Sequence, residues 1–235
     1  PSSQNKVGIA QRIWLPALQS GTVPCAVFAQ FRDGANGIMV TVTADTTGRL
    51  RAHAGDSQTA AVLTSTNPVI TANGWYHLET VVDNSANTIE IRVEGVTVVS
   101  GTITIASDIA QVVSTSRTSN TSQGYQWYMK DYVVYNGAGS FNNDFLGSVL
   151  VANLMPTADI DLNWTPSTGS AGWSILDNIP PVDTTYLSAP YNAGAYEDPY
   201  VGELSDLPVE TTSVKGLITF VRAAKSDGGD GTLQV

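Results

Sequence analysis

The sequence is poor in cysteine and histidine, and this excludes several kinds of site. Cys25 is the one cysteine among 235 residues, so the chain cannot form an intrachain disulfide. The apolar neighbours of Cys25 favour a small buried hydrophobic residue in a strand. His53 and His77 are the two histidines, which nearly excludes a histidine-rich zinc or copper site. We expect His77 to be a structural residue at an edge of a β-sandwich.

Long apolar runs and positive charge are also scarce. No hydrophobic run approaches the length of about 18 residues that a transmembrane helix needs, so we expect no membrane insertion. The net charge is −10, with 21 acidic against 11 basic residues. An acidic surface repels phosphate, which argues against nucleic-acid binding. Neither a phosphate-binding loop nor a Gly-x-Ser-x-Gly elbow occurs.

The residues that are abundant favour β-structure. Thr, Val, Ser, Ala, Gly and Asn are common, whereas Lys and Glu, which favour helix surfaces, are few. The clearest strand pattern begins at Trp75, where Trp75, His77 and Glu79 alternate with apolar or neutral residues. After the turn at 83–87, a second alternating strand follows. These patterns predict an antiparallel meander with one buried and one solvated face.

Turn signals divide the rest of the chain. Strand-like runs flank the turn at 32–37, another hairpin turns at 45–48, and residues 125–136 read as a strand with aromatic residues on both faces. Short strands at such spacing predict a two-sheet sandwich. After Val151 the chain becomes rich in Pro, Asp, Thr and Gly. We therefore expect a β-sandwich over residues 1–155, and a loop-rich C-terminal β-region or second small β-domain over 156–235, with a last strand within 212–232.

No catalytic carboxylate pair is evident. Sandwich-fold glucanases place their carboxylates in a Glu-x-Asp-x-x-Glu pattern on one strand, and this sequence lacks it. Glu90 and Glu94 come nearest, but they alternate with apolar residues and indicate a solvated strand face. The sequence predicts no catalytic residues and no enzymatic activity.

Oxygen-rich loops leave calcium as the one cofactor to consider. Calcium prefers six to eight oxygen ligands, often from several loops. Each loop is first explained as a turn, because Asn and Asp side chains cap their own backbone. The candidate residues are Asp33 with Asn36, Asp45, Asp56, Asn143 with Asp144, and Asp159 with Asp161.

Two groups of aromatic residues are candidates for binding. In the first, Tyr125, Trp127, Tyr128, Tyr132 and Tyr135, we favour packing within the sheets over ligand contact. The second group lies in a polar, proline-containing segment that cannot bury four tyrosines alone. It is predicted to contact neighbouring subunits or, alternatively, glycan, and consists of Tyr186, Tyr191, Tyr196 and Tyr200.

The segment Gly137–Val151 ("GAGSFNNDFLGSVLV") packs Asn142, Asn143 and Asp144 between glycines and a hydrophobic run. These side chains could hold a cation, position a sugar or make a turn. We interpret them as capping a tight connection, after which Phe145 and Leu146 lead into the next strand.

Two stretches carry a family resemblance. Residues 70–102, with Gly-Trp-Tyr-His before a strand and then "IEIRVEG" after an acidic turn, resemble the concanavalin A-like lectin/glucanase superfamily, close to laminin-G-like modules. Residues 129–190, with "DYVVY", "GSFNNDFLG" and "WTPS", resemble structural proteins of tailed bacteriophages, and residues 213–232 fit the same proteins.

The resemblance implies an all-β fold, a concanavalin A-like antiparallel β-sandwich (jelly roll) with an additional C-terminal β-region. It further implies a non-enzymatic structural component of a tailed-phage virion, such as a capsid decoration, fibre or tail protein. Such a protein would be located in the virion and would contact other virion proteins and itself, as a homo-oligomer. The alternative that it implies is a carbohydrate-binding adhesin or receptor-binding module on the virion surface, with host-surface glycan as its partner.

Overall fold

The structure is a computed structural model. It describes residues 4–18, 26–56, 60–115, 127–137, 140–169, 171–176, 184–188 and 200–218. The chain divides into two compact units, unit 1 (Pro1–Val151) and unit 2 (Ala152–Val235), a few residues before the division that the sequence suggested at 155. Cys25 lies outside the described residues.

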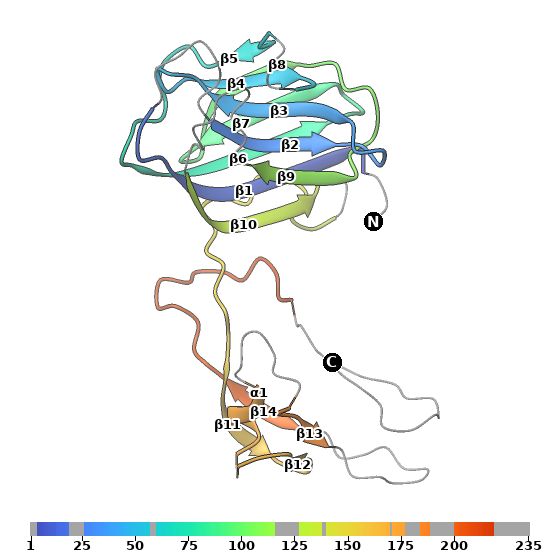
Figure 1. Ribbon diagram of the computed structural model, residues 1–235, viewed down its shortest axis with the longest axis vertical. Helices are drawn as coiled ribbons and strands as arrows, with labels where there is room; N and C mark the ends of the chain where they lie inside the picture. Colours follow the sequence, from blue (N-terminus) through green and yellow to red (C-terminus); the bar gives the residue numbers. More distant parts are fainter. Residues whose placement is uncertain are drawn as a thin grey trace. The chain divides into compact units, whose positions relative to one another are not determined.

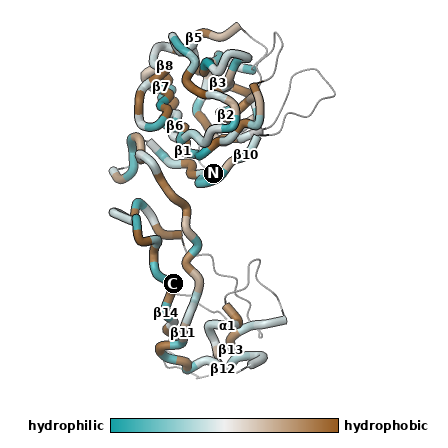
Figure 2. The backbone as a smooth tube through the Cα atoms, turned by 90° about the vertical axis from the view of Figure 1, so that its left-hand side faces the viewer, coloured by the Kyte–Doolittle hydropathy of each residue, from teal (hydrophilic) through white to brown (hydrophobic). Residues whose placement is uncertain are grey.

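Unit 1 is an antiparallel sandwich of two five-stranded sheets (Figures 1 and 2). The first sheet, in the order β10-β1-β6-β7-β8, comprises β10 (Tyr128–Asn136), β1 (Lys6–Trp14), β6 (Trp75–Asp83), β7 (Thr88–Val93) and β8 (Val96–Thr102). The second sheet, in the order β5-β4-β3-β2-β9, comprises β5 (Leu63–Thr64), β4 (Leu50–Ala54), β3 (Ile38–Ala44), β2 (Ala26–Arg32) and β9 (Gln111–Thr115). The predicted all-β fold, an antiparallel β-sandwich, is confirmed.

The β6–β7 hairpin was predicted from alternating residues, and in the structure one of the two alternating sets points into the core. Leu78 pairs with Val93 and Val82 with Ile89, and all four side chains point into the core. The turn from β7 to β8 passes through Glu94 and Gly95, with φ of 50° and 78°. Two successive residues in the left-handed region are typical of the tight turns that match the twist of a hairpin.

The core lies between the two sheets. Its largest fully buried side chains include Phe28 and Phe31 from the second sheet and Ile9, Ile13 and Ile91 from the first. Full burial of such a side chain contributes about 1.5–3 kcal/mol relative to exposure. This apolar interior orients the sheets, so that alternate residues of the first sheet point away from the core, onto what we call its outer face.

Unit 2 contains only short elements in its described part (Figure 1). They are β11 (Pro156–Asp161), β12 (Thr165–Pro166), α1 (Trp173–Leu176), β13 (Leu187–Ser188) and β14 (Val201–Leu204). The strands form two two-stranded antiparallel sheets, β11-β14 and β12-β13. An additional C-terminal β-region is therefore present. The last strand predicted within 212–232 is wrong for residues 212–218, which form none, and its remainder lies outside the described residues.

No helix in the described part of the chain is long and apolar enough to cross a membrane.

Candidate functional site

A strap, residues 140–151, crosses the outer face of the first sheet after β10. The sequence interpretation had Phe145 and Leu146 entering another strand. That was wrong, since the structure assigns no strand to 140–151. The main-chain groups of the strap are instead bound by side chains of the sheet beneath it. Asp144 accepts a hydrogen bond from the adjacent N–H of Phe145 at 2.9 Å, and Gly147 has a φ of 77°, so local capping and a glycine-dependent bend are both present.

Glu79, at the middle of β6, is the central anchor of the strap. It lies on the outer face, yet only 1% of its surface is exposed. Its Oε1 atom accepts hydrogen bonds from the N–H groups of Leu146 at 2.8 Å and Gly147 at 3.1 Å. Burial raises the pKa of the Glu79 carboxyl, although these two hydrogen bonds and the charge of Arg92 oppose the rise.

Three further contacts fasten the strap on either side of Glu79. The Arg92 guanidinium in β7 lies 3.6 Å from the centre of the Phe145 ring. Arg12 in β1 donates a hydrogen bond to the Ser148 hydroxyl at 2.9 Å. These two contacts and the Glu79 anchor occur along the strap in the order in which β7, β6 and β1 lie in the sheet.

The last anchor is on β10. The Val151 N–H donates to Asp131 Oδ1 at 3.0 Å, and Asp131 Oδ2 lies 3.6 Å from Arg12 Nε. Asp131 has a φ of 52° and lies where the pairing of β10 with β1 shifts register. A β-bulge re-aims a side chain in this way. The strap therefore runs across four strands, from β7 to β10, and closes over the outer face.

Beneath the strap, Tyr135 of β10 lies across Gly8 of β1. A Cβ atom on Gly8 would lie 2.0 Å from Tyr135 Cζ, so only glycine leaves room for the ring. Burial raises the pKa of Tyr135, and the nearby charges of Glu79 and Asp144 raise it further. Among the described residues, neither the Tyr135 hydroxyl nor Glu79 Oε2 has a hydrogen-bond partner. The part of the outer face beneath the strap therefore contains polar groups, but these groups are buried.

Beyond the strap, three aromatic residues form a row across the sheet. Trp14 at the end of β1 pairs with Tyr128 of β10 on one side and with Trp75 of β6 on the other. Directly paired residues of antiparallel strands point to the same face. The rings of Trp14 and Tyr128 are 5.2 Å apart, and Lys130 Nζ lies 4.8 Å from the centre of the Trp75 ring. Trp75 is 47% and Tyr128 53% exposed, so this aromatic row is accessible.

The rest of the first aromatic group packs as predicted, as far as the structure describes it. Trp127 packs edge-on against Phe28 in the core, with ring centres 5.6 Å apart, and Tyr132 is partly buried against the core. Tyr125 lies outside the described residues. Tyr128 differs from these residues because its ring is open to solvent.

His77 is buried at 3% exposure, on the same strand face as Trp75 and Glu79. Burial lowers its pKa, and the charge of Arg12 lowers it too, while Glu94 and Asp131 act in the opposite direction. The Glu94 side chain, one of the two glutamates considered for catalysis, accepts the His77 backbone N–H at 2.7 Å. Glu90, the other one, is bound by Arg92 Nε at 2.8 Å and by the Thr97 hydroxyl at 2.6 Å. Both glutamates therefore have structural partners.

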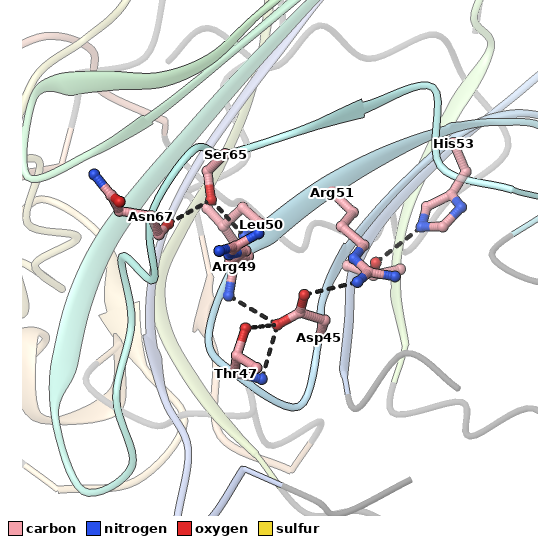
Figure 3. A network of polar contacts seen from close by, with 9 residues as sticks. Asp45, Thr47, Arg49, Leu50, Arg51, His53, Ser65 and Asn67 are labelled. Atoms are coloured by element: carbon pink, nitrogen blue, oxygen red, sulfur yellow. Dashed lines mark hydrogen bonds and ion pairs between the residues drawn. The ribbon is translucent and has the colours of Figure 1, made fainter. Parts of the chain in front are cut away.

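The second sheet carries a polar network on the face away from the core (Figure 3). Asp45 directly follows β3 and accepts hydrogen bonds from the backbone N–H groups of Thr47 at 2.8 Å and Arg49 at 3.0 Å. Its other oxygen pairs with Arg51 at 2.8 Å. Burial would raise the pKa of Asp45, but these hydrogen bonds lower it. The neighbouring pair of Thr43 Oγ1 and His53 Nε2 lies at 3.0 Å.

The acidic calcium candidates are turn and cap residues where the structure shows their contacts. Asp33 accepts the N–H groups of Ala35 and Gly37, at 2.9 and 2.6 Å. No group of three or more His, Cys, Asp or Glu side chains that could hold a metal ion occurs in the part of the chain that the structure describes. Calcium binding stays untested.

In unit 2, the predicted tyrosines separate into two environments. Tyr186 is 55% exposed. The Tyr200 hydroxyl instead donates to Asp159 Oδ1 at 2.8 Å, and the same carboxylate caps Gly172 and Trp173 through their N–H groups, both at 2.7 Å. Asp159, another calcium candidate, thereby joins β11 to α1. Tyr191 and Tyr196 lie outside the described residues.

Sequence reasoning missed Glu79 as an anchor, and it missed Trp14 and Asp131 altogether. The alternation around Glu79 placed it on the polar face, but nothing local showed that the strap would cover it. Trp14 lies in β1, for which no strand was predicted. The bulge at Asp131 has no evident sequence signal.

Comparisons with known proteins show a distant and partial likeness. No protein-family model matches the sequence, and no curated protein matches it. Among solved structures, the chain is similar to a sialidase (12% identity, TM-score 0.42, covering 58% of this chain and 14% of the sialidase). It is also similar to Trypanosoma rangeli sialidase in complex with 2,3-difluorosialic acid (15%, TM-score 0.41, 56% and 20%).

A third similar structure is the carbohydrate binding module CBM66 from Bacillus subtilis, at 13% identity and a TM-score of 0.40, with 57% of this chain and 76% of that module covered. This chain spans a fifth or less of either sialidase.

Proposed function

We propose that unit 1 is a non-enzymatic carbohydrate-binding domain, and that the aromatic row Tyr128–Trp14–Trp75 is its binding surface. The observation that carries this proposal is the row itself. Three aromatic side chains lie on one face of three adjacent strands, and two of them are about half exposed. Aromatic rings bury large apolar area in a fixed geometry, which suits them to stack against the flat C–H faces of sugar rings.

Polar groups next to the row supply the directional contacts that a sugar also needs. Lys130 is exposed and offers an ammonium group over Trp75, and Tyr128 carries a phenolic hydroxyl. Aromatic surface combined with a few convergent polar groups is typical of small-ligand sites. The strap covers the neighbouring part of the outer face, so the ligand would contact the aromatic row and the polar groups next to it.

The contacts of Glu79 and Glu90 support the non-enzymatic part of this proposal. Glycoside hydrolysis usually requires two carboxyl groups roughly 5–9.5 Å apart that flank the bond to be cleaved. Glu79 is covered by the strap, and Glu90 is engaged by Arg92 and Thr97. Neither lies in the aromatic row.

Binding of the full chain to a panel of immobilised neutral, acidic and sialylated glycans tests the proposal. We expect at least one glycan class to bind, and Trp75→Ala to weaken that binding by about tenfold or more, equal to about 1.4 kcal/mol. Phe141→Ala is the matched control, since Phe141 is an aromatic residue that is 87% exposed but lies outside the row. The proposal fails if no glycan binds, or if both variants bind like the wild type.

A second candidate is a structural component of a tailed-phage virion. It is supported by the family resemblance of residues 129–190 and by the apolar surface of unit 2, where Val209 and Ile218 are 101% and 76% exposed. In this role the domain would be an adhesin or decoration held on the particle by protein contacts. Mass spectrometry of purified particles tests it: the chain should be present in stoichiometric amount, and its absence would refute the assignment.

A further inference from the structure

A second row of paired residues lies beside the aromatic row on the outer face of the first sheet. Two positions away from the aromatic row on each strand, Lys130 of β10 pairs with Arg12 of β1, and Arg12 pairs with His77 of β6. Side chains two positions apart on a strand point to the same face, so the two rows share this surface. We call Lys130, Arg12 and His77 the basic row.

The three members of the basic row differ in their availability to a ligand. His77 is 3% exposed, and burial lowers its pKa, so its ring is uncharged at pH 7. Arg12 is already engaged, because its guanidinium pairs with Asp131 at 3.6 Å and donates to Ser148 at 2.9 Å. Lys130 is exposed, and in the part of the chain that the structure describes no acidic side chain forms an ion pair with it. Lys130 is therefore the member that can bind an anion.

The ammonium group of Lys130 is positioned next to the aromatic surface. Its Nζ atom lies 4.8 Å from the centre of the Trp75 ring, although β1 separates β10 from β6 in the sheet. The lysine side chain thus extends across β1, towards the exposed aromatic rings. A cation–π contact at an exposed site is weak, so an anionic group can bind this ammonium in its place. One sugar residue is large enough to contact both a ring and the ammonium.

This inference rests on the proposed glycan binding and names the class of glycan. We infer that the ligand is an anionic glycan, in which a sugar ring stacks on the aromatic row and a carboxylate or sulfate group of the glycan binds Lys130. Hydrogen bonds between charged groups are roughly twice as strong as those between neutral groups. A neutral glycan offers the same lysine only hydroxyl groups and lacks that gain.

The charges along the basic row also orient the ligand. Glu94 is exposed and lies beyond His77 on the β7 side, where its carboxylate accepts the His77 N–H at 2.7 Å. Lys130 is at the opposite end of the row, on β10. The row is therefore negative at its β7 end and positive at its β10 end. An anionic group on the glycan would lie towards β10 and away from Glu94.

The net charge of −10 does not argue against an anionic ligand, because most of it belongs to unit 2. Residues 152–235 contain 11 acidic and 3 basic residues, a net charge of −8, whereas residues 1–151 contain 10 and 8, a net charge of −2. Exposed charges farther apart than about 8–10 Å are largely screened at physiological ionic strength. The groups around Lys130 therefore determine whether an anion binds there.

The affinity of the full chain for matched sets of glycans tests the inference. Each set contains a neutral hexose oligosaccharide, the same oligosaccharide oxidised to the hexuronate at C6, and its sulfated form. In at least one set, we expect the wild type to bind an anionic form at least about threefold more tightly than the neutral form at about 0.05 M NaCl, and less selectively at about 0.5 M. Comparing the hexuronate with the sulfated form shows which anionic group the site accepts.

Substitutions of Lys130 separate the charge from the aromatic contact. Lys130→Gln should abolish the preference for the anionic form and leave the affinity for the neutral form within about twofold. Lys130→Arg keeps the positive charge and should keep the preference. Lys6→Gln is the matched control, since it removes the same charge at the other end of β1, where Lys6 pairs with Asp83, and should also keep the preference.

The possible failures are distinguishable. If the wild type binds glycans but holds neutral and anionic forms equally well, this inference is overturned and glycan binding by the aromatic row stands. The same conclusion follows if Lys130→Gln retains the preference, or if Lys6→Gln loses it to the same extent. If the wild type binds no glycan of any set, the proposed function fails and this inference fails with it.

Discussion

Replacing Glu79 with alanine tests whether one buried side chain holds the strap on the first sheet. The substitution removes the acceptor of two backbone N–H groups, those of Leu146 and Gly147, at 2.8 and 3.1 Å. Each buried donor left without an acceptor costs about 1–3 kcal/mol. The strap can lift and expose these groups to water, which limits the loss. We expect Glu79→Ala to lower the free energy of unfolding by about 2–4 kcal/mol.

Glu79→Gln separates the role of the acceptor from the role of the charge. Burial raises the pKa of Glu79, which means that the ionised form is less favourable in the folded chain than in water. A glutamine keeps an acceptor oxygen of the same reach and carries no charge to desolvate. We therefore expect Glu79→Gln to stay within about 1 kcal/mol of the wild type.

Two measurements check this pair of variants. Urea unfolding at neutral pH gives the stability, and hydrogen exchange at Leu146 and Gly147 shows whether the strap has opened locally. Glu90→Ala is the control, since Glu90 lies on the same face but makes a surface ion pair with Arg92, which is worth about 0–1 kcal/mol. The reasoning is refuted if Glu79→Ala leaves both amides protected, or if Glu79→Gln is as damaging as Glu79→Ala.

Two further predictions concern packing and pH. Gly8→Ala should lower the free energy of unfolding by about 1–3 kcal/mol, because the new methyl group meets the Tyr135 ring. Urea unfolding checks this, and the loss should shrink when Tyr135→Ala is present as well; an equal loss in both backgrounds would contradict the clash. Hydrogen bonds and Arg51 lower the pKa of Asp45 below its usual 3.8, so the folded chain releases this proton at lower pH than the unfolded chain. The stability from Asp45 is thus present above about pH 4 and lost as the pH falls through the lowered pKa. Asp45→Asn should unfold with a shallower acid dependence than the wild type below that pH, and identical slopes would exclude the assignment.

The strands could be predicted where their signal is local. Alternation around Trp75 and Ile91 identified the β6–β7 hairpin, because successive side chains of a strand point to opposite faces. The predicted solvated face holds for β7 but not for the middle of β6, where His77 and Glu79 are buried. The turn at Asp45 was likewise recognised from residues that cap their own backbone. Both inferences needed only neighbouring residues.

The strap and the aromatic row could not be predicted, because they depend on contacts between distant residues. Glu79 binds Leu146, 67 positions further along the chain. Trp14 acquires its significance only when β1 is placed between β6 and β10, a neighbourhood that no local pattern encodes. The hydrophobic run after Asp144 looked like a strand, since the sequence alone does not show that the sheet side chains bind its backbone.

The order in which the strap meets the strands has a consequence for folding kinetics. Its anchors lie on β7, β6, β1 and β10, so the strap finds its binding positions only after these four strands have assembled. We expect its contacts to be absent from the transition state for folding. Weakening an anchor should then accelerate unfolding and leave the folding rate nearly unchanged. The strap would act as a latch, which sets how long the finished sandwich persists rather than how fast it forms.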